Sequence, residues 1–359
     1  MKKELTRFVS PSDKAFLYTG RIDFSDRDRP CFIFAGSSAA FRFRGTAFAV
    51  KLINRHCCYH NYLGVVIDGA VQEKIEIPQH GVELTLTAAE GLADAEHEIV
   101  LYKCQDASHY FDFLGLYIEE TAVLLPPPAR PARRIECYGD SVSAGEVSEA
   151  VDYIGRPDPE GHDGVYSNSW YSYAFFTARR LNAELHDIAQ GGIALFDGTG
   201  YFHGPDYVGM ESVWDRLRYC DYLGETTPWD FSRYTPHVVI IAIGQNDANP
   251  ENYMGRDAEK SARWKQHYKD FIRKLRAKYP DALFVLTTTI LCHDAAWDDA
   301  IDEAAQELAD PKVVHFLYSA NGCGTPGHIR KPEAEKMAEE LAAFLESFGE
   351  DIWQDGSGR

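Results

Sequence analysis

Hydrophobic and polar positions alternate with a period of two in the first 125 residues. The alternating runs are short, are separated by turn residues, and lie at 41–45, 62–69, 71–77, 82–88, 97–103 and 111–120. This alternation predicts half-buried strands, and the spacing of the runs is typical of an all-β sandwich. The Asp68-Gly69 pair is the strongest hairpin signal among them. We therefore expect a β-sandwich or jelly-roll domain over residues 1–125.

The pattern changes beyond residue 134, where buried runs alternate with helical ones. The sequence predicts strands over 133–139, 184–189, 237–244, 282–291 and 313–318, and helices over 168–184, 213–223, 258–279 and 332–348. Strands that alternate with helices imply βαβ units and a parallel sheet covered on both faces. We expect such a three-layer α/β domain over residues 135–359. Residues 126–134 form the predicted linker, because the consecutive prolines Pro126 to Pro128 cannot donate to a sheet.

Charge and hydropathy exclude several classes of partner. The chain has 36 Lys and Arg residues against 55 Asp and Glu residues, and this net charge of -19 argues against nucleic acid binding. The longest apolar strand, 238–243, is far shorter than the roughly 20 residues that span a bilayer. The first residues contain no signal-peptide pattern, so we expect a cytoplasmic protein, or a secreted one if a leader precedes this sequence.

The cysteines give no sign of a metal or redox site. There are eight of them, including the adjacent pair Cys57 and Cys58, and none of them forms a C-x-x-C motif. Neither zinc-ligand spacing nor a thioredoxin-like motif is present. We therefore expect reduced thiols, no metal and no cofactor.

Small polar residues follow the predicted strands. Ser141 comes after the first strand, Gly192 after the second, Asn246 after the buried strand 237–244, and His328 after the last. Each has an ordinary structural explanation, as a helix cap, a turn glycine, an Asx turn or a structural histidine. However, ligands bind at the carboxyl edge of a parallel sheet, where all four residues should meet. Together they supply a nucleophile, a general base and two oxyanion donors, which indicates acyl transfer.

The same residues resemble a known family. The run IECYGDSVSAG at 135–145 is similar to the first sequence block of the GDSL or SGNH hydrolases, and Gly192, Asn246 and His328 follow in the order of the later blocks. The first domain resembles the N-terminal jelly roll of carbohydrate esterase family 2. The resemblance implies Ser141 as nucleophile, His328 as base, and an oxyanion hole made of Ser141, Gly192 and Asn246.

This family resemblance implies an acetyl esterase without a cofactor, acting on acetylated mono- or oligosaccharides through an acyl-enzyme. Two other functions stay open: a GDSL-type lipase or thioesterase acting on other acyl esters, and a carbohydrate-binding protein without activity. The sequence also leaves the oligomeric state open.

The sequence departs from the family pattern next to the histidine. Most members have an aspartate three residues before it, and here that position is Thr325. The resemblance to family members without this carboxylate implies a Ser-His dyad whose imidazole is oriented by a backbone carbonyl. Asp294 or Asp302 could also fill the role spatially.

Three aromatic residues are candidates for sugar binding. Trp170, Tyr201 and Trp297 lie in segments that lead towards the predicted site. Aromatic faces suit sugar rings, although core packing is the commoner explanation for any one of these residues. We expect Trp297, in a loop after the strand that ends near Leu291, to form a wall of the pocket.

Overall fold

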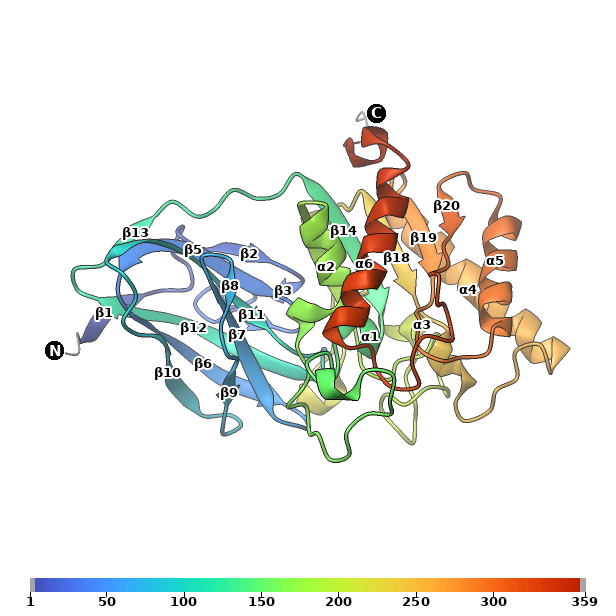
Figure 1. The fold of residues 1–359 in the computed structure, drawn as a ribbon, viewed down its shortest axis with the longest axis horizontal. Coiled ribbons are helices and arrows are strands. Elements are labelled where there is room, and N and C mark those ends of the chain that lie inside the picture. Colours follow the sequence, from blue (N-terminus) through green and yellow to red (C-terminus); the bar gives the residue numbers. More distant parts are fainter. Residues whose placement is uncertain (1–3, 356–359) are drawn as a thin grey trace.

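Two antiparallel sheets form the first domain of the computed structural model, which describes residues 4–355 (Figure 1). The strands are β1 (Leu5–Val9), β2 (Leu17–Thr19), β3 (Ile22–Asp23), β4 (Cys31–Phe32), β5 (Ser38–Gly45), β6 (Phe48–His56), β7 (Asn61–Ile67), β8 (Ala70–Val71), β9 (Ile75–Ile77), β10 (Glu83–Ala89), β11 (Ala95–Lys103), β12 (His109–Glu119) and β13 (Val123–Leu125). One sheet has the order β10-β6-β12-β4-β3, with β1 on β12; the other has the order β13-β5-β11-β7-β8, with β2 on β5 and β9 on β7.

The sandwich core follows from the period of two in the sequence. Phe41 and Phe43 of β5 face the same core as Val50 and Leu52 of β6, and all four side chains are fully buried. Strand residues two apart point to the same face, so each alternating run contributes its apolar set to one shared core. The predicted sandwich is confirmed.

A five-stranded parallel sheet forms the second domain. Its order is β15-β14-β18-β19-β20. The strands are β14 (Arg133–Gly139), β15 (Ala183–Ala189), β18 (Val238–Ala242), β19 (Leu283–Thr287) and β20 (Val313–His315), and the short strands β16 (Arg216–Arg218) and β17 (Thr227–Pro228) pair separately. The helices are α1 (Ser141–Ala144), α2 (Tyr173–Arg180), α3 (Met210–Val213), α4 (Ala258–Lys278), α5 (Ala296–Leu308) and α6 (Lys331–Glu346).

Helices cover both faces of this sheet, as the uninterrupted apolar run in β18 predicts. Ile241 of β18 belongs to the core that contains Trp264 of α4 and Ile301 of α5. Its neighbour Ile240 belongs to the opposite core, with Leu341 of α6. The three-layer α/β domain expected from the sequence is therefore confirmed.

Several expected elements differ from the structure, and the strands expected to end at 291 and 318 end at Thr287 and His315. The α-helix expected over 213–223 is wrong: Arg216–Arg218 forms β16, with its arginines on either side of the buried Leu217, and only the end of α3 and the 3-10 turn Asp221–Leu223 are helical in that range. The helix expected over 168–184 shortens to α2, because Ser172 accepts a hydrogen bond from Phe175 N and caps the helix there. The segment after Leu291, expected as a loop, contains α5.

The two domains meet along a broad contact as well as through the linker. An extended segment runs between β13 and β14 (Figure 1), and β14 begins at Arg133, so the last two residues of the predicted linker belong to the strand. Arg21 of the sandwich donates to Glu136 Oε1 of β14 at 3.1 Å, and both side chains are fully buried. None of the helices within residues 4–355 combines the length and apolar character of a membrane span.

Candidate active site

Ser141 lies at the carboxyl edge of the parallel sheet, on a sharp turn from β14 into α1. Asp140 caps α1 by accepting from Val142 N at 2.9 Å, and Ser141 is the first helical residue. A Cβ at Gly139 would lie 2.0 Å from Ser143 Oγ, so only glycine leaves room for the turn. The cap that explains this motif locally is therefore made by Asp140, and the hydroxyl of Ser141 is left to face the cleft.

A line of hydrogen bonds runs from Ser141 to a carboxylate. His328 Nε2 lies 2.8 Å from Ser141 Oγ, and His328 Nδ1 lies 2.5 Å from Asp158 Oδ2. The other oxygen, Asp158 Oδ1, accepts from His328 N at 2.9 Å and from Arg330 Nη2 at 2.8 Å. Because the Arg330 side chain is fully buried, these contacts fix the carboxylate relative to the imidazole ring.

The protonation of His328 follows from these partners. A carboxylate can only accept, so Nδ1 carries the proton and Nε2 is left to accept from the Ser141 hydroxyl. Burial works to lower the pKa of His328, but the charge of Glu146 and the hydrogen bond to Asp158 outweigh it and raise the pKa above its usual 6.5. Burial would raise the pKa of Asp158, yet its bonds to His328 and Arg330 hold that pKa well below 3.8.

Ser141 and Gly192, whose backbone N–H groups are the predicted oxyanion donors, both line the same cleft. The Gly192 N–H meets no acceptor among residues 4–355. The Ser141 N–H opens α1, where the first N–H groups have no partner inside the helix. Gly192 has a φ of 71°, and a Cβ there would lie 2.7 Å from the Cβ of Tyr201. The sequence-predicted glycine is thus required by its conformation and by its surroundings.

Asn246 lies at the rim of the cleft, in the 3-10 turn η5 (Gln245–Ala248) that follows β18. Its Nδ2 donates to Asp140 Oδ2 at 3.1 Å and to the Ile193 carbonyl at 3.0 Å. The amide therefore ties the Ser141 turn to the Gly192 loop. The four residues predicted from the strand ends are brought together by the fold.

The β-sandwich also holds the Gly192 loop. Asp106, between β11 and β12, accepts from Gly191 N and from Gln190 Nε2, each at 2.7 Å. Ser108 Oγ donates to Gln190 Oε1 at 3.0 Å. Because these bonds join the two domains, the position of the Gly192 N–H depends on the sandwich.

The cleft above Ser141 has a volume of about 830 Å³ and draws its walls from both domains. The sandwich contributes Cys57, Cys58 and Tyr59, and the second domain contributes Tyr201 and Tyr222. These three tyrosines are 48%, 63% and 57% exposed, so their rings are available to a ligand. All eight cysteines are free thiols. Within the described part of the chain, no three metal-ligating side chains gather in a set suited to a metal ion.

Two of the three predicted aromatic residues do not line this cleft. Trp297 is 0% exposed, because α5 turns it into the core against Trp264, with ring centres 5.3 Å apart. Trp170 packs on Tyr102 and under the guanidinium of Arg179. Only Tyr201 reaches the cleft. The prediction of Trp297 as a pocket wall is therefore wrong, and so is that of Trp170.

The carboxylate that orients His328 was missed by the sequence reasoning. Asp294 pairs with Arg256 at 2.9 Å and Asp302 with His315 at 3.2 Å, so neither reaches the imidazole. The expected backbone-carbonyl orienter is also wrong, because Nδ1 faces Asp158. A weak signal was available in Gly327, where a Cβ would lie 2.8 Å from Asp158 Oδ1. A glycine next to the histidine indicates that another segment of the chain approaches closely, but it does not reveal which segment.

Two segments of the chain match known protein families. Residues 18–128 match the carbohydrate esterase 2 N-terminal family, and residues 137–328, more than half of the chain, match the GDSL-like lipase/acylhydrolase family.

Relatives of known function and structure match nearly the whole chain. A cellulase/esterase, CelE, from Acetivibrio thermocellus is 33% identical over 92% of this chain, which spans 39% of that longer protein. An acetylxylan esterase / glucomannan deacetylase from Cellvibrio japonicus is 27% identical, with 95% of this chain and 90% of the relative covered. The solved structure of a family two carbohydrate esterase from Clostridium thermocellum in complex with cellohexaose is 28% identical, covers 94% of this chain and 100% of its own, and has a TM-score of 0.78. The chain therefore belongs to the GDSL-like lipase/acylhydrolase family and carries the N-terminal domain of carbohydrate esterase family 2.

Proposed function

We propose that this chain is a serine esterase that removes O-acetyl groups from carbohydrates through an acetyl-enzyme. The observation that carries the proposal is the hydrogen-bonded line from Ser141 through His328 to Asp158, at the mouth of a cleft with unpaired N–H groups. The deacetylase activity named for the Cellvibrio japonicus relative and the cellohexaose bound by the structural neighbour support a carbohydrate substrate.

Acylation begins when His328 Nε2 takes the proton of Ser141 Oγ, which attacks the acetyl carbonyl carbon. The carbonyl oxygen becomes negatively charged and accepts from the N–H groups of Ser141 and Gly192. Asn246 adds a third donor by sharing one of its amide hydrogens with this oxygen. The bond from carbon to the sugar oxygen then breaks, and His328 gives its proton to the departing sugar hydroxyl.

Deacylation repeats the same steps with water. His328 Nε2 takes a proton from a water molecule whose oxygen attacks the acetyl carbon. When the bond to Ser141 Oγ breaks, His328 returns the proton to the serine and acetate leaves. Asp158 keeps Nδ1 protonated throughout and stabilises the imidazolium that forms in each half of the cycle.

The lining of the cleft favours a short acyl group over a lipid chain. Most of the residues that line the cleft carry carboxylate, amide, imidazole or tyrosine side chains, and the apolar side chains Phe202, Ala248, Leu291 and Pro326 are scattered among them. A long alkyl chain would leave these polar groups without water or a partner, which costs free energy. Among 4-nitrophenyl esters, we expect acetate to be cleaved much faster than octanoate; faster cleavage of octanoate would indicate a lipase.

The experiment that tests the proposal is acetate release from a panel of acetylated mono- and oligosaccharides. Wild type should release acetate, and Ser141→Ala should release none above the uncatalysed rate. If wild type cleaves neither these sugars nor 4-nitrophenyl acetate, the chain is a carbohydrate-binding protein. If Ser141→Ala matches wild type, the nucleophile is wrong.

A further inference from the structure

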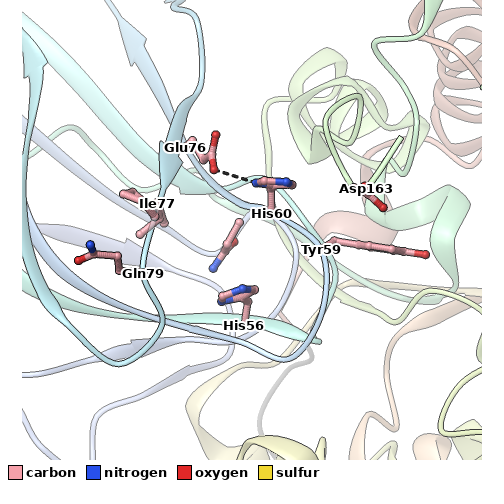
Figure 2. Close-up of a pocket in the computed structure, with 9 residues that line it drawn as sticks. His56, Tyr59, His60, Glu76, Ile77, Gln79 and Asp163 are labelled. Atoms are coloured by element: carbon pink, nitrogen blue, oxygen red, sulfur yellow. Dashed lines mark hydrogen bonds and ion pairs between the residues drawn. The ribbon is translucent and has the colours of Figure 1, made fainter. Parts of the chain in front are cut away.

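A second hollow, of about 400 Å³, lies at the end of the β-sandwich (Figure 2). Its walls come from the segment after β6, from the end of β9, and from Asp163 of the second domain. Tyr59 lines both this hollow and the cleft that contains Ser141. The two depressions are therefore neighbours that share one aromatic wall.

The backbone around the hollow adopts conformations that residues with side chains avoid. Tyr59, Gln79 and Asp163 have φ values of 35°, 54° and 43°. Left-handed backbone is uncommon outside glycine, and such residues gather at ligand sites, where the surrounding structure holds them in place. Three of them line one hollow although they come from three separate loops.

Contacts between the domains hold these loops together. His60 N donates to the Asp163 carbonyl at 3.1 Å. At the next residue, Gly164, a Cβ would lie 2.6 Å from Gln105 Nε2 and 3.3 Å from the Cβ of Tyr59. The loop from the second domain is thus seated on the sandwich. Asp163 also lies only five positions beyond Asp158, so one loop serves the hollow and the active site.

The side chains around the hollow offer an aromatic face and paired polar edges. His60 Nδ1 lies 2.8 Å from Glu76 Oε1 on one wall, with Gln79 on another and Tyr59 pointing towards the second domain (Figure 2). Both members of the His60–Glu76 pair are about half exposed, so each keeps polar atoms for a ligand. Amide, carboxylate and imidazole groups exchange hydrogen bonds with hydroxyls, and the tyrosine ring suits the C–H face of a pyranose.

We propose that this hollow, the sandwich-end site (Tyr59, His60, Glu76, Gln79 and Asp163), binds a neutral sugar unit of the same chain whose acetyl ester lies at Ser141. This inference rests on the proposed carbohydrate substrate. An anionic sugar is disfavoured, because Glu76 and Asp163 carry negative charge and none of the described residues that line the hollow is a Lys or an Arg. Of the two histidines in its wall, His60 pairs with Glu76, and burial lowers the pKa of His56. The site gives the enzyme a preference for oligosaccharides over single sugars.

The test compares substrate lengths in variants of the sandwich-end site. His60→Ala and Gln79→Ala should each raise KM for a partially acetylated hexasaccharide about fivefold, the loss expected for one hydrogen bond. The same variants should leave kcat/KM on an acetylated monosaccharide within about twofold of wild type. Glu83→Gln is the matched control, since Glu83 also forms an exposed ion pair, with Lys51 at 2.7 Å, but lies outside the hollow.

Calorimetric titration gives a readout that needs no catalysis. Unacetylated gluco-, xylo- and mannohexaose are titrated into wild type, His60→Ala and Glu83→Gln. At least one of the three hexaoses should bind wild type and Glu83→Gln with the same affinity. The same hexaose should bind His60→Ala about fivefold more weakly. The site is refuted if no hexaose binds, or if the variants change neither binding nor the preference for length. Absence of acetate release from any sugar would instead overturn the proposed function.

Discussion

Asp158 is the residue of the candidate active site that is hardest to predict from the sequence. It lies 170 positions before His328, in an irregular loop between two prolines, whereas the usual position holds Thr325. Ser141, Gly192, Asn246 and His328 could be predicted because each follows a strand, and strand ends meet at one edge of a parallel sheet. The path of a long loop is set by tertiary packing, so local patterns do not reveal which side chain it delivers.

Replacing Asp158 with asparagine tests its role in orienting the imidazole. The amide preserves the shape of the side chain but no longer requires a proton on Nδ1, so the wrong tautomer becomes available. We expect kcat on 4-nitrophenyl acetate to fall on the order of 10³- to 10⁴-fold, with little change in KM. Asp302→Asn, which alters a carboxylate paired with His315, should keep wild-type kcat. Equal activity of the two variants would remove Asp158 from the mechanism.

The pH dependence of activity should follow His328. Only the neutral imidazole can take the serine proton, and the pKa of His328 lies above 6.5, so kcat/KM should rise with pH through a midpoint above that value. Glu146 Oε2 lies 3.8 Å from Nε2 and stabilises the protonated ring. Glu146→Gln removes this charge and should move the midpoint to lower pH in a rate profile with an aryl acetate. If the midpoint of the Glu146→Gln profile is unchanged or moves to higher pH, a group other than His328 controls the pH dependence.

At the scale of elements, a long and regular hydrophobic pattern made an element predictable, and short elements with weaker patterns were missed. The uninterrupted apolar run of β18 and the long amphipathic α4 were predicted nearly to the residue. In contrast, α5 was missed, although Trp297, Ile301 and Ala304 recur at helical spacing and all three are buried. The local pattern predicts a helix around β16, and it cannot reveal the strand because β16 pairs only with the two residues of β17, a contact that no local period encodes.

The loop between β6 and β7 should carry an unusually reactive thiol. The contacts of the Cys57 sulfur with Cys220 and Cys58 lower the pKa of Cys57 below its usual 9.0, which increases the fraction of Cys57 thiolate at a given pH. At about pH 6, iodoacetamide should therefore modify Cys57 faster than the exposed Cys323, as measured by peptide mass spectrometry.

Modification of Cys57 should also lower activity on acetylated oligosaccharides, because Cys57 lines the cleft and the added group would occupy space there. Cys57→Ser should be protected from the inhibition, whereas Cys323→Ser should respond like wild type. Equal labelling rates for the two cysteines would contradict the assigned ionisation.

On the scale of the whole molecule, the β-sandwich is part of the active site. Asp106 holds the Gly192 loop, and Tyr59 separates the cleft from the sandwich-end site. The sequence predicted two domains and the order in which they occur. It could not predict how they meet, because that contact combines single buried polar residues with apolar residues from loops, such as Ile33 and Phe34, and neither leaves a periodic pattern.

Breaking the ion pair between the domains should destabilise the protein strongly. Arg21→Ala leaves Glu136 buried without its cation, which typically costs about 3–5 kcal/mol. Urea unfolding followed by tryptophan fluorescence should show this loss in the free energy of unfolding. Arg42→Ala breaks an exposed pair with Glu96 and should cost at most about 1 kcal/mol. A wild-type midpoint for Arg21→Ala would mean that the domains are held together by other contacts.

The central claim is that Ser141 becomes acetylated during turnover, and trapping the acetyl-enzyme tests it most directly. Wild type is mixed with an acetylated sugar or 4-nitrophenyl acetate, quenched in acid during steady state, and digested for peptide mass spectrometry. The account predicts an acetyl group on the peptide that contains Ser141, and none there in Ser141→Ala. An acetyl group found only on another residue, or wild-type acetate release by Ser141→Ala, would contradict it.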